Sequence, residues 1–73
     1  MSKEVEQLPK RLLDVLRGIG EAKPTKIIAA ELGISEQTVL VHRRRLYSRL
    51  RAHSQSEVVR IALAASASLM NGD

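Results

Sequence analysis

Residues 26–50 read KIIAAELGISEQTVLVHRRRLYSRL, and this stretch predicts two helices joined by a short turn. Apolar residues recur every three or four positions on both sides of the turn, which is the spacing of amphipathic helices. Gly33 suits the left-handed conformation that ends a helix, and Ser35 is a good N-cap for the next one. Ala29 is small enough to let the two helices approach closely. Together these features predict a helix-turn-helix.

The same reasoning adds one helix before this pair and one after it. We expect an all-α fold with four helices, over residues 9–19, 24–32, 36–51 and 55–70. Pro9 and Pro24 suit the first position of a helix, and Ser54 with Glu57 forms a capping box for the last one. The core-facing positions at helical spacing are Leu12, Val15, Leu16, Ile19, Ile28, Ala29, Leu32, Val39, Leu46, Leu50, Val58, Ala62, Ala65 and Leu69.

These elements form one domain, which we expect to cover residues 8–70. Residues 1–7 and 71–73 are expected to be flexible termini, because chain ends are often poorly ordered.

The composition limits what such a domain can do. The absence of cysteine excludes disulfides and thiolate metal sites and suits a reducing cytoplasm. The single aromatic residue, Tyr47, leaves almost no means of stacking on unpaired bases. No apolar run approaches the ~20 residues of a membrane span, and the start lacks a secretory signal. His42 and His53 have no neighbouring cluster of acids, so we expect no metal. The sequence shows no strained nucleophile turn and no phosphate loop, so we also expect no other cofactor and no enzyme activity. Without a membrane span, we expect no membrane partner.

Positive charge is concentrated in one segment. The net charge is +4, yet no acidic residue falls between Glu36 and Glu57. That segment holds Arg43, Arg44, Arg45, Arg49 and Arg51. A local basic patch of this kind is typical of binding to phosphate or to an anionic membrane.

A helical projection of residues 36–51 separates these arginines. The seam of Val39, Leu46 and Leu50 faces the core, and the opposite side carries Gln37, Val41, Arg44 and Ser48, flanked by Leu40, Arg45 and Arg51. Arg43 lies near the seam, so we expect its stem to cover the core while its head pairs with an acid such as Glu31 or Asp14. A purely solvated basic helix is the alternative, but apolar Leu40 and Val41 beside the charge favour a binding face.

The stretch resembles the LuxR-type (GerE-like) DNA-binding domain of bacterial transcription regulators. The residues that match the family pattern in register are Lys26, Ile28, Ala29, Leu32, Ile34, Ser35, Thr38, Val39 and His42. The segments LPKRLLDVL and SQSEVVRIA extend the resemblance over about Leu8 to Leu69. The chain departs from the pattern at Pro9 (usually Thr), Leu12 (usually Glu, within a polar network), Leu40 (usually Lys or Arg) and Gln55 (commonly Arg).

The resemblance implies sequence-specific binding of double-stranded DNA, with the helix of residues 36–51 in the major groove. We expect Arg44 to read guanine. Leu40 and Val41 are expected to pack against thymine methyl groups, and Gln37 to contact adenine or a phosphate. We expect phosphates to be contacted by Thr25, Lys26, Thr38, His42, Arg45, Arg49 and Arg51. His42 reads equally well as a boundary histidine that holds the helix pair together. Leu40, in place of a basic residue, predicts a target that differs from those of the relatives.

The last helix carries a second apolar strip, about 100° from its core stripe, because each strip residue follows a core residue by one position. The strip consists of Val59, Leu63, Ser66 and Met70. It favours a homodimer, in agreement with the family, in which this helix is the dimer contact. Packing of the strip against the first helix is the alternative.

Two other functions fit the same fold. One is a protein-interaction module that uses the Leu40–Val41 patch and the strip on the last helix. The other is a domain similar to region four of a sigma factor, with RNA polymerase as its partner. The closer match to the LuxR pattern favours a transcription regulator acting at the bacterial nucleoid.

Overall fold

The computed structural model describes Val5 and residues 7–70, and of residues 67–70 it describes the backbone alone. This part of the chain forms helices α2 (Lys10–Gly20), α3 (Thr25–Leu32), α4 (Glu36–Leu50) and α5 (Gln55–Met70), and contains no strand. The predicted all-α fold is confirmed, and each helix bound lies within one residue of its predicted place. No helix in these residues has the length and apolar character that crossing a membrane requires.

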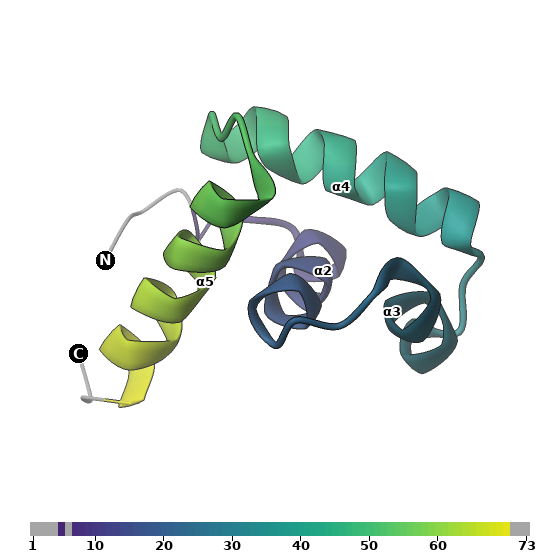
Figure 1. Ribbon diagram of the computed structural model, residues 1–73, viewed down its shortest axis with the longest axis horizontal. Helices are drawn as coiled ribbons and strands as arrows, with labels where there is room; N and C mark the ends of the chain where they lie inside the picture. Colours follow the sequence, from purple (N-terminus) through teal and green to yellow (C-terminus); the bar gives the residue numbers. More distant parts are fainter. Residues whose placement is uncertain (1–4, 6, 71–73) are drawn as a thin grey trace.

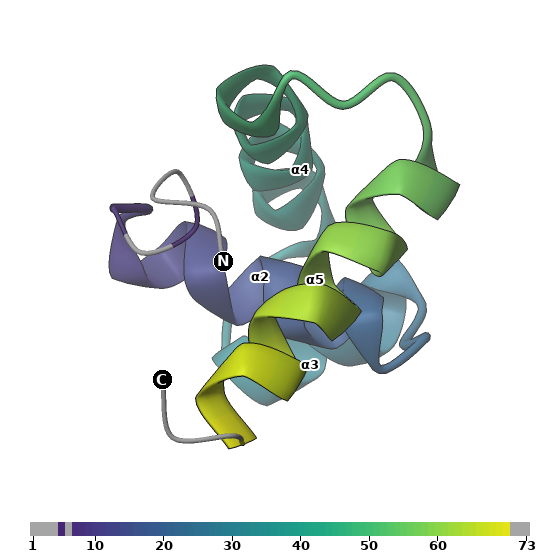
Figure 2. The same ribbon diagram turned by 90° about the vertical axis from the view of Figure 1, so that its left-hand side faces the viewer.

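The other three helices are arranged around α2. In Figure 1, α4 runs across one side of the molecule, with α3 beneath its N-terminal end and α5 beneath its C-terminal end. α2 packs against both α4 and α5, while α3 packs mainly against α4. The turned view shows α5 crossing in front of α2 and α4 lying above both (Figure 2). Among the described residues, no helix covers the side of α4 that faces away from α2.

The core consists of aliphatic side chains, as the helical spacing predicts. Val15, Val39, Leu46 and Val58 are completely buried. The other predicted core residues are buried or packed against these, except Leu69, whose side chain lies outside the described residues.

Val5 is only 6% exposed and belongs to the core, although the sequence predicted a domain that begins at residue 8. A single valine in the charged start of the chain shows no periodicity, so the sequence assigned it to the flexible segment of residues 1–7. The rest of that prediction, and the predicted tail of residues 71–73, cannot be compared, since apart from Gln7 these residues lie outside the described part.

The turn between α3 and α4 is fixed by its backbone. Gly33 has a φ of 69°, and its N–H donates to the carbonyl of Ala30 (3.3 Å), while the N–H of Ile34 donates to that of Ala29 (3.0 Å). This pair of bonds is the Schellman motif that ends a helix. The side chain of Ser35 then accepts the N–H of Thr38 (3.1 Å), which starts α4 as predicted.

In the part of the chain that the structure describes, two residues other than glycine adopt the same left-handed conformation after a helix. Ala22 follows α2 with a φ of 61°, and Arg51 follows α4 with a φ of 55°. Each is held by the same two kinds of backbone bond as Gly33. After α2, the N–H of Ala22 donates to the carbonyl of Ile19 (3.0 Å) and that of Lys23 to Gly18 (3.0 Å). After α4, the N–H of Arg51 donates to Ser48 (3.2 Å) and that of Ala52 to Tyr47 (3.0 Å). The left-handed region costs an L-residue energy that glycine avoids.

Two details of the predicted helix starts are wrong. Pro9 and Pro24 are extended residues that precede α2 and α3 rather than their first helical residues. Each still supplies a carbonyl that accepts an early helical N–H. At α5, Ser54 Oγ accepts the N–H of Glu57 (3.3 Å), but the Glu57 carboxylate takes the N–H of His53 (2.6 Å). In the predicted capping box, the Glu57 carboxylate would accept the N–H of Ser54, but it accepts the N–H of the preceding residue, His53, instead.

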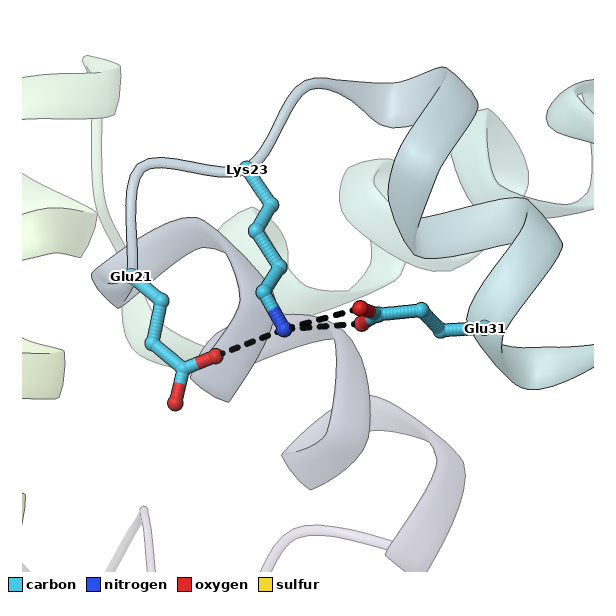
Figure 3. A network of polar contacts seen from close by, with 3 residues as sticks. All are labelled: Glu21, Lys23 and Glu31. Carbon is cyan, nitrogen blue, oxygen red and sulfur yellow. Dashed lines mark hydrogen bonds and ion pairs between the residues drawn. The ribbon is translucent and has the colours of Figure 1, made fainter.

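The loop between α2 and α3 is tied down by one lysine. Lys23 Nζ lies 3.0 Å from a Glu21 oxygen and 2.8 Å from a Glu31 oxygen, so it joins the loop to α3 (Figure 3). Hydrogen bonds to Glu31, and then to Glu21, raise the pKa of Lys23 above its ordinary value of 10.5.

Candidate nucleic-acid interface

The side of α4 that no helix covers carries the residues predicted to read bases. Leu40 and Val41 are 47% and 40% exposed, and Gln37 and Arg44 are exposed beside them. We call Gln37, Leu40, Val41, Arg44 and Ser48 the outer face. Val39 and Leu46, on the opposite side of the same helix, are fully buried. The projection therefore placed these side chains correctly, and their roles toward DNA stay predictions.

Arg43 holds α4 in place, but through different partners from those predicted. It donates to Thr25 Oγ1 (3.2 Å), to the Tyr47 hydroxyl (3.1 Å) and to Gln55 Oε1 (3.2 Å). Its guanidinium also lies over the Tyr47 ring, 5.7 Å from the centroid. Arg43 thus joins α4 to the first residues of α3 and α5, where neutral oxygens come within its reach.

The two acids expected for Arg43 are paired elsewhere. Glu31 binds Lys23, while Asp14 lies 3.6 Å from Lys10 and 3.7 Å from Arg11. A helical projection locates a side chain around its own axis, and it does not show which neighbouring helix brings an acid within range.

The predicted phosphate contacts fall into two kinds. Four are exposed cations that form no ion pair with any described residue: Lys26, Arg45, Arg49 and Arg51. Thr25, Thr38 and His42 are half-buried. The Thr25 hydroxyl accepts from Arg43, which leaves its own hydrogen for another acceptor. Thr38 Oγ1 lies 2.8 Å from Ser35 Oγ, so one of these two hydroxyls has a hydrogen to donate outward.

His42 has an unusual environment. Its Nδ1 is buried and has no hydrogen-bond partner among the described residues. An N–H at that position would be a buried donor without an acceptor, which costs more than an unused lone pair. The tautomer with its hydrogen on Nε2 is therefore favoured. The described residues contain no group of three or more His, Asp or Glu that could hold a metal ion.

The structure also shows a groove that the sequence did not indicate. It has a volume of about 330 Å³ and lies where the start of α2 meets α4. Arg11 lines it from α2, and His42, Arg45 and Arg49 line it from α4. No local pattern could have predicted this groove, because it depends on how two helices distant in the sequence pack together.

The predicted dimer strip of α5 is exposed in part. Leu63 is 57% exposed, and Ser66 is exposed beyond it. Val59 is half-buried and packs against the core, and its role in a dimer stays a prediction. The side chain of Met70 lies outside the described residues.

Comparison with known proteins agrees with this geometry. Residues 6–62 match the GerE family, described as bacterial regulatory proteins of the luxR family. The chain is 39% identical over 57 residues to the transcriptional regulatory protein YdfI of Bacillus subtilis (strain 168). That alignment covers 78% of this chain but 27% of the relative, so the chain spans about a quarter of the relative's length. No solved structure matches the chain. The chain belongs to the luxR family of bacterial regulatory proteins, a family of DNA-binding transcription regulators and not of enzymes.

Proposed function

We propose that this chain binds specific sequences of double-stranded DNA as a dimer, with α4 in the major groove. The observation that carries the proposal is the outer face of α4, where Arg44 stands exposed between the apolar side chains of Leu40 and Val41. The major groove of B-DNA is wide enough to admit an α-helix. The opposite face of α4 is fixed in the core, and Arg43 ties the helix to α3 and α5, so the outer face is rigidly presented.

Each residue of the outer face suits one kind of base contact. Arg44 can donate two hydrogen bonds to the O6 and N7 acceptors of guanine. Leu40 and Val41 suit the methyl group of thymine, and Gln37 suits adenine or a phosphate. An apolar residue at position 40 makes thymine the expected preference there.

Phosphate contacts position such a helix without reading sequence. The exposed cations Lys26, Arg45, Arg49 and Arg51 are suited to this task by charge. The hydroxyl groups of Thr25 and Thr38 and the imidazole N–H of His42 are hydrogen-bond donors on α3 and α4, so these residues also suit phosphate contacts. Affinity that depends on so many phosphate contacts falls steeply with added salt.

The exposed part of the α5 strip supports the dimer. Leu63 and Ser66 would face the same residues of a second copy across a two-fold axis. A two-fold dimer reads two related half-sites, spaced about one helical turn apart.

Selection of bound fragments from random double-stranded DNA tests the proposal. We expect an enriched motif with two inverted half-sites, each holding a guanine for Arg44 and a neighbouring thymine. Enrichment of no fragment, with recovery of a protein partner through Leu40 and Val41, would favour the interaction-module alternative. Association with RNA polymerase without any other DNA-binding factor would favour the sigma-like alternative. Either result would contradict the proposal.

A further inference from the structure

The groove beside α4 has the character of an anion site. Arg45 and Arg49 stand on successive turns of α4, and Arg11 faces them from the first turn of α2. No acidic residue lines the groove. Outside the groove, the carboxylate of Asp14 lies close to both Lys10 and Arg11, so it serves two cations at once. The groove therefore has an excess of positive charge.

A further observation points the same way. The start of α2 lies at the groove, through Pro9 and Leu12. That helix start has no side-chain cap and no acid in its first turn. In the described part of the chain no side chain compensates its first N–H groups, and such groups favour an anion.

The position of the groove indicates which anion it takes. Ser48 belongs to the outer face of α4 and also lines the groove, so the two surfaces are continuous. A duplex held on the outer face would run its sugar–phosphate backbone along this flank.

We propose that a phosphate of the DNA backbone occupies this groove, and that Arg11 of α2 is one of its contacts. The inference rests on the proposed function, and it extends the DNA-binding surface to a helix outside the helix-turn-helix. It assigns Arg11 to the interface, beside Arg45 and Arg49.

The test compares Arg11→Ala with Arg17→Ala. Both arginines are exposed on α2 and both changes remove one charge, but Arg17 does not line the groove. Affinities for the selected site and for a random duplex are measured by fluorescence anisotropy over a range of salt concentrations. Arg11→Ala should lower the slope of log K against log salt by about 0.9, the value for one lost phosphate contact. The affinity should fall by a similar factor on both duplexes, and Arg11→Lys should keep most of it. Arg17→Ala should leave the slope unchanged.

A second measurement uses the unmodified chain. The backbone amides of Arg11 and Leu12 should shift in NMR spectra when the duplex is added, and much less with inorganic phosphate at the same concentration. Equal slopes for the two alanine variants, while the unmodified chain binds DNA, would overturn the inference and leave the proposed function standing. Equal shifts with inorganic phosphate would also overturn it, since the groove would then take a free anion. If the unmodified chain binds no duplex, both proposals fail.

Discussion

Arg43 and Arg44 are neighbours in the sequence, but the structure gives them opposite surroundings. Arg43 is half-buried and donates hydrogen bonds to Thr25, Tyr47 and Gln55, whereas Arg44 is exposed on the outer face. The two side chains have the same charge, so replacing each one separates a structural role from a DNA-binding role.

Arg44→Ala should leave the melting temperature unchanged and weaken binding to the selected DNA site. Loss of a bidentate contact with guanine costs about 1–3 kcal/mol, roughly 5- to 150-fold in affinity. Arg43→Ala should instead destabilise the fold by about 1–2 kcal/mol, because several hydrogen bonds to a charged group are lost. Calorimetry and anisotropy on both variants make the comparison. Equal weakening of specific and random DNA by Arg44→Ala would show that Arg44 does not read a base.

Lys23 gives a prediction about pH. Hydrogen bonds to Glu31 and Glu21 raise its pKa above 10.5, so folding favours its protonated form. The stability that it contributes is complete below pH 10.5, the unfolded-state value, and disappears as the pH rises through the higher folded-state value. Lys23→Met should therefore lower the melting temperature at pH 8, and the difference from the unmodified chain should shrink above pH 10.5. Lys26→Met, at an exposed lysine that forms no ion pair with a described residue, is the control and should show no such change. A constant difference across the pH range would contradict this account.

At the scale of the helix, the ends of α2 and α4 are strained by the residues that follow them. Ala22 and Arg51 both adopt left-handed backbone, where glycine is favoured. Ala22→Gly and Arg51→Gly should each stabilise the fold by about 0.5–1 kcal/mol. Ala30→Gly, the same change inside α3, should instead destabilise it by about 1 kcal/mol. Thermal melts distinguish these signs. DNA affinity should fall only for Arg51→Gly, which also removes a proposed phosphate contact, and a loss of stability in Ala22→Gly would refute the argument.

The packing of α2 on α5 depends on a glycine. A Cβ at Gly20 would lie 2.7 Å from the Cβ of Ala62, which is too close for either backbone to remain in place. Gly20→Ala should cost about 1–3 kcal/mol from overpacking, more than the gain in helix propensity at this last helical residue. The double variant Gly20→Ala, Ala62→Gly should recover part of the loss, because it removes the opposing methyl group. Chemical denaturation of the unmodified chain, of Gly20→Ala, of Ala62→Gly and of the double variant completes the comparison, and strictly additive losses would show that the two sites do not meet.

For the whole molecule, what the sequence could predict follows from the range of each interaction. The helices, their caps at Gly33 and Ser35 and the core stripes depend on neighbouring residues, and the structure confirms them. The outer face of α4 was predictable for the same reason. The partners of Arg43 and the groove at Arg11 were not, because both require knowing how separate helices meet. Val5 joins the core only through such tertiary packing.

The α5 strip decides how many copies act together, and this property belongs to the whole molecule. Leu63 is 57% exposed, so a charged residue there should leave the fold of one copy intact. It would, however, place two like charges near a two-fold axis, which opposes association. Leu63→Glu should therefore shift sedimentation profiles toward the monomer and reduce cooperative binding to a duplex with two half-sites, while binding to a single half-site stays nearly unchanged. Ala64→Glu, an exposed change of the same charge about 100° around the helix, should leave both properties close to those of the unmodified chain. If Leu63→Glu still binds the paired half-sites cooperatively, the dimer contact lies elsewhere and the two-fold arrangement on α5 is wrong.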